Sequence, residues 1–278
     1  MPYGFSIAEG TARTFWVNGD SVSTYYVGQI VAWNASAGAA NVGAVSPLPA
    51  ASGTFDATGE VVIAGIVVGF DSNPPEWDTT YNLQKLTGAC TTQAHVAART
   101  SAGVYNQGRG MYNVGDHQPL LEIAPIGPDT LIKGPICETA GGAPTVVTST
   151  VADTTGGTTA LTTNACAFTP VANTCSIYCR TGTNAGIWRT TNDTSTTGPD
   201  VTIAFPNDVS IGDTFVRFSI KQGLSQIVHI TGLAIDNTLS GGTTNSYGIH
   251  VFYIDARTAG KEYAVFKFDG IHFSAVRA

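Results

Sequence analysis

Charged side chains are scarce in this chain. Asp, Glu, Lys and Arg make up 12% of its 278 residues, about half of the share of about 25% in a typical soluble domain. Scarce charge combined with 43% apolar residues excludes intrinsic disorder, which requires low hydrophobicity and high net charge. The 13 basic residues form no run and the net charge is −7, so we expect neither nucleic acid nor a membrane surface as a partner.

Long apolar stretches are also lacking. The longest, residues 61–70, is interrupted by two glycines and is about half as long as the roughly 20 residues of a membrane-spanning helix. Its Val and Ile content indicates buried strands instead. Residues 1–4 contain no basic segment leading into an apolar one, so no secretory signal is expected.

Cysteines are few and odd in number, which disfavours a disulfide framework in a chain without a secretory signal. They are Cys90, Cys137, Cys166, Cys175 and Cys179. The spacing of the last three fits no zinc ribbon or finger. We expect buried, reduced thiols, with a metal site or a bridge as the alternative. On a strand, Cys175 and Cys179 would share one face.

Catalytic motifs are absent: there is no nucleophile elbow, no zinc-protease motif and no phosphate-binding loop. His229, His250 and His272 could meet across a sheet as a metal site or a pH switch, but packing or surface roles are expected. Asp208 and Asp213 could hold Ca²⁺, although turn formation explains them better. We therefore predict no enzyme, no catalytic or metal-binding residues and no cofactor.

What the sequence does contain is strand and turn signals. Favoured helix formers are few, and the best helical candidate, residues 79–86, could equally form a strand. Short β-branched and aromatic runs alternate with turns rich in Gly, Asn and Asp, which predicts an all-β fold. The expected strands are residues 24–33, 60–70 (as two strands broken near Gly65), 119–126, 145–151, 176–180, 186–190, 201–205, 214–220, 227–235, 248–255, 262–269 and 271–276.

The clearest strand pattern lies near the end of the chain. Residues 250–255 and 263–269 flank a turn, and Ala264, Phe266 and Phe268 fall on one face of the second strand. This predicts a hairpin with an apolar seam.

A Gly-rich stretch at residues 138–144 ends in proline and is the best candidate for a domain boundary. We therefore expect two β-rich domains. Residues 1–138 would form a small N-terminal β-barrel-like domain, and residues 145–278 a C-terminal β-sandwich.

Two segments carry a resemblance to a known family. Residues 175–190 contain the pattern G-x-N-x-G-x-x-R, and residues 204–215 contain F-P-N-x-x-x-x-G-D-x-F. Together with residues 26–33 and 63–70, which look like the β-barrel head of such proteins, they resemble capsid decoration (cement) proteins of tailed bacteriophages.

The resemblance implies a β-rich, commonly trimeric protein on the outside of the phage head, assembled in the host cytoplasm. Its partners would be the major capsid protein and copies of itself, and it would stabilise the capsid by bridging capsid subunits. Gly182, Asn184 and Gly186 would form a turn between strands. Arg189 would follow on the next strand and make an ion pair or a subunit contact.

Aromatic side chains add candidates for the interface. We expect most of them to be core or interface anchors, with a carbohydrate platform as the alternative. The predicted interface residues are Arg189, Trp188, Trp16 and Phe15. Residues 1–138 would contact the capsid, and residues 1–22 would form either a docking arm or an ordinary first strand and loop.

Two other classes of virion protein fit the same composition. One is a receptor-binding or carbohydrate-binding module of a head fibre or tail spike, and the other is a tail-tube component. An enzyme is the most remote alternative.

Overall fold

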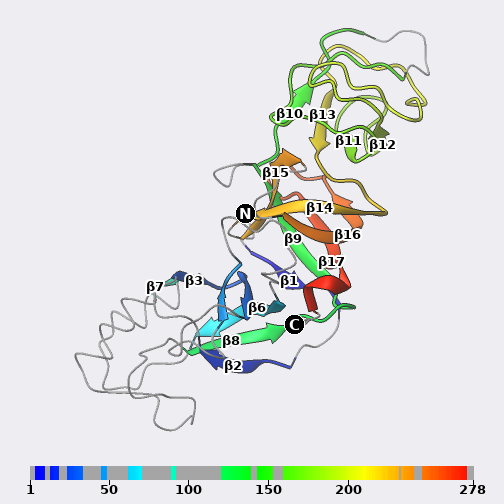
Figure 1. Ribbon diagram of the computed structural model, residues 1–278. Coiled ribbons are helices and arrows are strands. Elements are labelled where there is room, and N and C mark those ends of the chain that lie inside the picture. Colours follow the sequence, from blue (N-terminus) through cyan, green and yellow to red (C-terminus); the bar gives the residue numbers. More distant parts are fainter. Residues whose placement is uncertain are drawn as a thin grey trace.

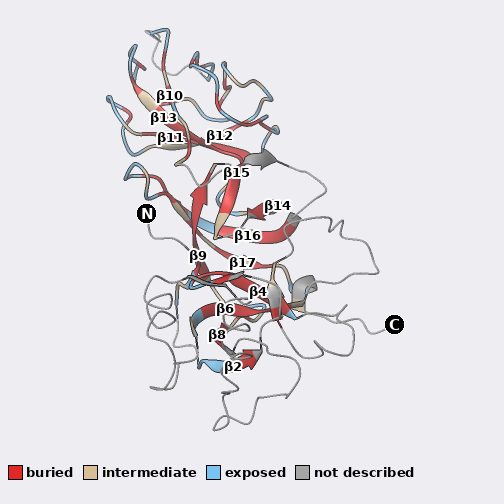
Figure 2. Cartoon of the chain, turned by 90° about the vertical axis from the view of Figure 1, so that its left-hand side faces the viewer, coloured by how far each residue is buried: buried red, intermediate tan, exposed pale blue. Residues whose placement is uncertain are grey.

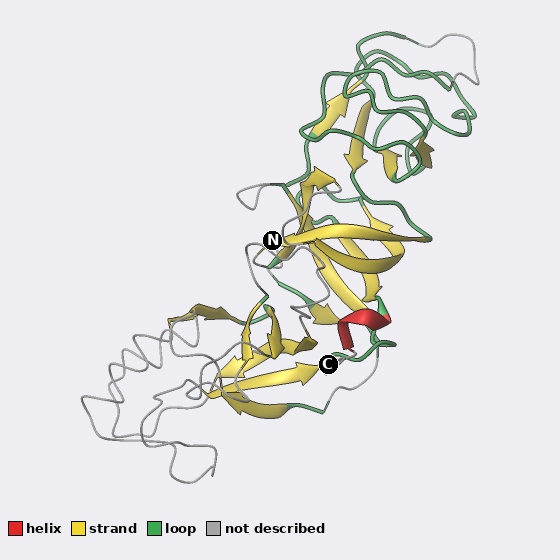
Figure 3. Ribbon diagram, in the orientation of Figure 1, coloured by secondary structure: helices red, strands yellow, loops and turns green. Residues whose placement is uncertain are grey.

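The computed structural model describes residues 4–9, 13–18, 24–33, 45–48, 62–70, 89–91, 120–138, 143–152, 159–231, 233–240 and 246–273. Within these ranges the chain forms strands and one short 3-10 helix, η2 (Gly270–Phe273), and no α-helix (Figure 3). The predicted all-β class is therefore confirmed. The helical candidate at residues 79–86 lies outside the described residues.

A closed five-stranded barrel forms the middle of the molecule (Figure 1). Its strands are β9 (Ile132–Cys137), β14 (Leu224–Thr231), β15 (Ala234–Ser240), β16 (Ser246–Asp255) and β17 (Tyr263–Phe268). They follow the ring order β9-β15-β14-β16-β17 and return to β9, with β9 and β15 parallel and the other neighbours antiparallel. The short strand β1 (Ser6–Ile7) pairs with β9. Closure pairs the strands all round the ring, which removes the exposed edges of an open sheet.

The barrel interior is filled by the predicted apolar seam. In β17, Ala264, Phe266 and Phe268 are fully buried while the residues between them are half-buried, so the expected hairpin of β16 and β17 is confirmed. Phe5 packs edge-on against Phe266 with ring centroids 6.0 Å apart. Gly134 on β9 makes room for this ring, because a Cβ at that position would lie 2.3 Å from Phe5.

An open sheet lies on one side of the barrel. Its strands, in spatial order, are β2 (Phe15–Asn18), β8 (Leu120–Pro125), β6 (Val62–Phe70), β4 (Ile30–Trp33) and β5 (Val45–Pro47). A separate pair is formed by β3 (Thr24–Tyr26) and β7 (Ala89–Thr91). We call these seven strands the N-terminal sheet region. Its own core is built from Val17, Tyr25, Val31, Val45, Ala64, Val67, Leu121 and Ile123.

A third unit, which we call the inserted region (residues 143–220), lies on the opposite side of the barrel (Figure 1). The chain enters it after β9 and returns to the barrel at β14. Its sheet has the order β10 (Val146–Thr148), β13 (Thr214–Phe218), β11 (Cys175–Cys179) and β12 (Trp188–Thr191). One face covers a separate core under the long loops. The other face, with Tyr178, Val216 and Phe218, packs into the core of the barrel.

Two strand predictions for the first half need correction. Residues 24–33 form two strands, because the chain turns at Gly28, whose φ is +85°. Residues 60–70 were expected as two strands broken near Gly65, but β6 runs unbroken through that glycine. A Cβ on Gly65 would lie 2.4 Å from the carbonyl oxygen of Ala124. This glycine therefore permits close strand contact and does not make a turn.

Three predictions for the second half were also wrong. Residues 201–205 form no strand, and only Val201 makes an isolated bridge, to Thr191. Residues 227–235 were expected as one strand, but they belong to β14 and β15, which pair with each other. The expected strand at 271–276 is instead η2 as far as Phe273, and its remaining residues lie outside the described part of the chain.

The expected division at residues 138–144 is not confirmed. β9 precedes that stretch, yet it pairs with β15 and β17, which follow it. The closed barrel therefore combines strands from both sides of the predicted boundary, and the Gly-rich stretch marks the point where the chain leaves the barrel for the inserted region.

Candidate functional site

The two segments that carry the family resemblance lie against each other in the inserted region. Asn184 is fully buried between them. Its Nδ2 donates to the carbonyl oxygens of Asn207 and Asp208 at 2.8 and 3.2 Å, and its Oδ1 accepts from the Asn207 amide at 3.1 Å. The predicted turn is confirmed: Gly182 and Gly186, with φ of +79° and +91°, lie between β11 and β12. Asn184 thus fastens this turn to the second segment.

Asp213 serves the same loop structure. One of its carboxylate oxygens accepts from the Ser210 amide at 2.9 Å. A Cβ on Gly182 would lie 2.2 Å from this carboxylate, so the glycine allows the two segments to meet. Turn formation, which we preferred over Ca²⁺ binding, therefore accounts for Asp213.

Arg189 lies on β12, as predicted, but it bonds within its own chain. Nε and Nη2 donate to the Ala204 carbonyl oxygen at 3.0 and 2.9 Å, and Nη1 donates to the Trp188 carbonyl oxygen at 2.8 Å. The guanidinium also lies 5.3 Å from the centre of the Phe205 ring. Among the described residues it makes these bonds to carbonyls and no ion pair. Its main observed role is to tie β12 to the second segment.

Trp188 points to the other side of the sheet, toward the barrel. Its ring centroid lies 4.8 Å from Tyr178 and 5.5 Å from Phe218. The residue remains half-exposed, so one part of the ring packs inside the molecule and the rest faces solvent.

Phe15 lies far from Arg189 and Trp188, in the N-terminal sheet region. It stacks on Trp33, with centroids 6.5 Å apart and an interplanar angle of 13°. Each of these two residues is 37% exposed, so the stack presents an aromatic surface to solvent. Sequence reasoning named Phe15 but did not include Trp33 among the interface residues. The side chain of Trp16 lies outside the described residues.

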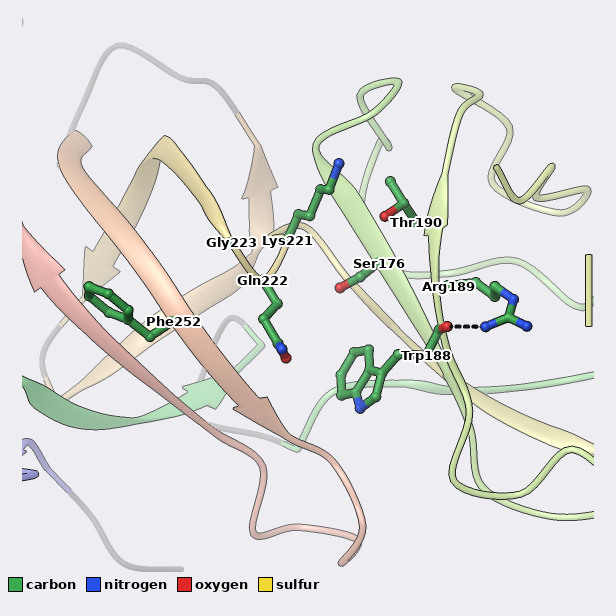
Figure 4. Close-up of a pocket in the computed structure, with 8 residues that line it drawn as sticks. All are labelled: Ser176, Trp188, Arg189, Thr190, Lys221, Gln222, Gly223 and Phe252. Atoms are coloured by element: carbon green, nitrogen blue, oxygen red, sulfur yellow. Dashed lines mark hydrogen bonds between the residues drawn. The ribbon is translucent and has the colours of Figure 1, made fainter. Parts of the chain in front are cut away.

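A groove runs between the inserted region and the barrel (Figure 4). Its volume is about 290 Å³. Ser176, Trp188, Arg189 and Thr190 form the wall on the inserted side, and Lys221, Gln222, Gly223 and Phe252 form the other wall. The groove brings together residues of β11, β12, β16 and the connection to β14, which no local sequence pattern links.

The outer surface of the barrel next to this groove is aromatic. A register shift in β16 between Val251 and Tyr253 interrupts the alternation, so that Phe252 and Tyr253 are both exposed, at 42% and 39%. Tyr253 contacts Tyr263 edge-on at 6.3 Å, and Lys133 Nζ lies 3.8 Å from the centre of the Tyr263 ring. Strict alternation along β16 would turn either Phe252 or Tyr253 inward, so the exposure of both side chains was not predictable from the sequence.

The four cysteines whose side chains are described are buried and free, as expected: Cys137, Cys166, Cys175 and Cys179. Cys175 and Cys179 share the core of the inserted region. Burial raises the pKa of Cys179 to about 12 and also raises the pKa of Cys175. These thiols are therefore poor nucleophiles at neutral pH. Nothing is described of the Cys90 side chain.

The two histidines whose side chains are described, His229 and His250, lie at separate places on β14 and β16. His229 is buried, and burial lowers its pKa while Asp236 acts in the opposite direction. His250 bonds through Nδ1 to the Ser225 hydroxyl at 2.9 Å and packs on Phe252. The side chain of His272 is not among the described ones. No group of three or more His, Cys, Asp or Glu in the described ranges is arranged to hold a metal ion.

Comparison with known proteins matches the chain to no protein-family model, no curated protein and no solved structure. The described residues include no helix that is long and apolar enough to cross a membrane.

Proposed function

We propose that the chain is a structural protein of a tailed-bacteriophage virion, which decorates the capsid exterior and stabilises it by bridging major capsid protein subunits. It acts by binding and not by catalysis. In this proposal residues 1–138 supply the capsid-facing part, and the protein assembles as a homotrimer on the capsid surface.

The observation that carries the proposal is the exposed aromatic stack of Phe15 and Trp33. Aromatic residues are enriched in protein–protein interfaces, and a stacked pair offers a rigid apolar surface at little cost in side-chain entropy. The stack lies in the N-terminal sheet region, which is the part assigned to the capsid.

The family resemblance supports the proposal from a second direction. Its two segments form one connected unit through the Asn184 amide and the Arg189 guanidinium. Residues that match the family pattern thus bond the two segments to each other. Such a structural role agrees with the β-rich body that the resemblance implies.

The proposal is tested by reconstitution on phage heads that lack the protein. The purified chain should co-sediment with these heads in a fixed ratio to the major capsid protein and raise the temperature at which the heads release DNA. Replacing both Phe15 and Trp33 with Ala should reduce occupancy at least tenfold, while the folded protein keeps its melting temperature within a few degrees.

The matched control replaces Val171 and Ile203, which are exposed apolar residues in loops of the inserted region, with Ala. This variant should bind the heads normally. A wild-type chain that stays monomeric and does not bind heads would refute the proposal. Equal occupancy of the phage heads by the Phe15/Trp33 variant and its control would show that the aromatic stack does not contribute to binding.

A further inference from the structure

The groove between the inserted region and the barrel has a fixed shape. The Gly223 amide donates to the Val251 carbonyl oxygen at 2.7 Å, which holds the connection 221–223 against β16. The Ser176 hydroxyl donates to the Ile220 carbonyl oxygen at 2.6 Å, and this bond fixes the opposite wall. A site that is formed before its ligand arrives avoids the cost of ordering these segments.

The groove has one cationic side chain facing it although the molecule is acidic. Lys221 lines it and no carboxylate does, in a chain whose net charge is −7. Arg189 also lies in the lining, but its guanidinium points to the other face of β12, over the Phe205 ring (Figure 4). The Arg189 guanidinium is occupied by the carbonyl oxygens of Ala204 and Trp188. Lys221 forms none of the ion pairs found among the described residues. Its ammonium group is therefore the one in this groove that is available to an anion.

Apolar rings accompany this charge. Trp188 on one wall and Phe252 on the other are both partly exposed, and Thr190 and Gln222 add a hydroxyl and an amide. In Figure 4 the side chains of Lys221 and Gln222 leave the connection in opposite directions, Lys221 on the side of Thr190 and Gln222 on the side of the Trp188 ring. Rings for apolar contact with a few polar groups for orientation are typical of small-ligand sites.

We propose that this groove binds a carboxylated sugar ring of an acidic glycan. The C–H face of the ring would pack on Trp188 or Phe252, the carboxylate would pair with the Lys221 ammonium, and Thr190 and Gln222 would bond ring hydroxyls. A volume of about 290 Å³ is just below the range of about 300–1,000 Å³ for small-molecule pockets, which suits one ring of a longer chain.

Other ligand classes fit the groove less well. A nucleic acid needs several cations along its phosphate backbone, whereas this groove has one available lysine. An added peptide strand needs a free sheet edge. The outer edge of β12 is already bonded, because Thr202 donates to the Thr190 carbonyl oxygen and Asn192 donates to that of Asp200, both at 2.9 Å.

The test uses the purified full-length chain and two acidic probes, tri-galacturonate and sialyllactose, each with a neutral counterpart, galactotriose and lactose. Binding is measured by titration calorimetry at low salt. We expect the chain to bind at least one acidic probe at least tenfold more tightly than its neutral counterpart. Uronates and sialates both carry a carboxylate on a six-membered sugar ring but differ in its position and in the other substituents, so the two pairs distinguish the two sources of this group.

Variants then locate the site. Lys221→Gln should weaken acidic-probe binding at least tenfold, and Phe252→Ala should weaken it severalfold. Lys267→Gln is the matched control, because Lys267 lies on β17 outside the groove lining and faces Asp129 at 3.7 Å. It should bind like the wild type. Melting temperatures within a few degrees of the wild type establish that each variant is folded.

Three results would overturn the inference: no binding of either acidic probe at millimolar concentration, equal binding of neutral and acidic probes, or equal effects of Lys221→Gln and Lys267→Gln. The inference goes beyond capsid decoration. Since no capsid is present in this experiment, its failure would leave the proposed function intact, and the reconstitution on heads could fail while glycan binding succeeds.

Discussion

The barrel and the inserted region are both all-β, but different interactions hold them together. The barrel strands are six to ten residues long, and main-chain hydrogen bonds close them into a ring. The inserted region has strands of three to five residues, and most of its chain is loop (Figure 2). Side chains such as Asn184 and Asp213 bond the main chain of these loops. Thus long strands need few special residues, whereas long loops depend on particular buried polar ones.

The largest effect is expected in the barrel core. Phe266→Ala removes a fully buried ring and should lower the free energy of unfolding by about 3–5 kcal/mol, since both apolar burial and packing are lost. Val265→Ala, at the half-buried neighbouring position, is the control and should cost about 1 kcal/mol. Urea unfolding followed by fluorescence measures both. Similar losses for the two variants would contradict the observed alternation along β17.

The connection between the two regions should be almost as sensitive. Arg180 follows β11 in the inserted region and pairs with the buried Glu262 of the barrel, and its Nε donates to the Ala256 carbonyl oxygen at 2.9 Å. Arg180→Ala leaves a buried carboxylate without its cation, so a loss of about 3 kcal/mol is expected.

The control for this prediction is Arg257→Ala. Arg257 also pairs with a carboxylate, that of Asp255, but its side chain is 69% exposed. Its loss should cost below about 1 kcal/mol. If both substitutions cost the same in urea unfolding, the buried ion pair does not fasten the inserted region to the barrel.

A smaller and more local effect is expected in the inserted region. Asn184→Ala leaves the Asn207 amide and two carbonyl oxygens without their bonds, which should cost about 1–3 kcal/mol. Asn192→Ala, at an exposed position in the same region, should stay within about 0.5 kcal/mol of the wild type. Hydrogen exchange of the amides around residue 207 should accelerate in the first variant alone. Unchanged exchange there would show that the loops do not depend on this side chain.

Alkaline pH should also distinguish the regions. Burial raises the pKa of Cys179 in the inserted region from 9.0 to about 12, so above pH 9 the unfolded chain releases this proton first. The free energy of unfolding must then fall as the pH rises from about 9 to about 12. Cys179→Ala should flatten this fall in urea titrations at several pH values.

The barrel contributes separately to the loss of stability at alkaline pH. Burial also raises the pKa of Tyr247 on β16. Tyr247→Phe should remove the part of the loss in the free energy of unfolding that is due to Tyr247 and leave the part that is due to Cys179. A pH slope that neither substitution changes would mean that other groups cause it.

Sequence patterns predicted some parts of this molecule well. The seam of Ala264, Phe266 and Phe268 was readable because strand side chains alternate and neighbours along the chain form the hairpin. The turn of Gly182 and Gly186 was predicted from the family resemblance, and the structure shows why glycine suits it, since both residues have positive φ. Both features depend on residues close together in the sequence.

The candidate sites were predicted only in part. Trp188 was named, but Lys221 and Phe252, which complete its groove, were not, because a register shift in β16 and a fold-dependent meeting of distant segments place them there. The prediction of a strand break at Gly65 was wrong. Glycine is needed there because the backbone of β8 lies too close to admit a Cβ, and the local sequence does not reveal that β8 is the neighbour.

The sequence by itself determined that this protein is built from strands and tight turns, because alternation and glycine conformation act within a few residues. Only the tertiary structure decided that β9 joins β15 and β17 in one closed barrel, with residues 143–220 inserted between them. The physical reason is that a strand edge bonds equally well to any main chain, so the choice of partner depends on which apolar faces can be buried together across the whole chain.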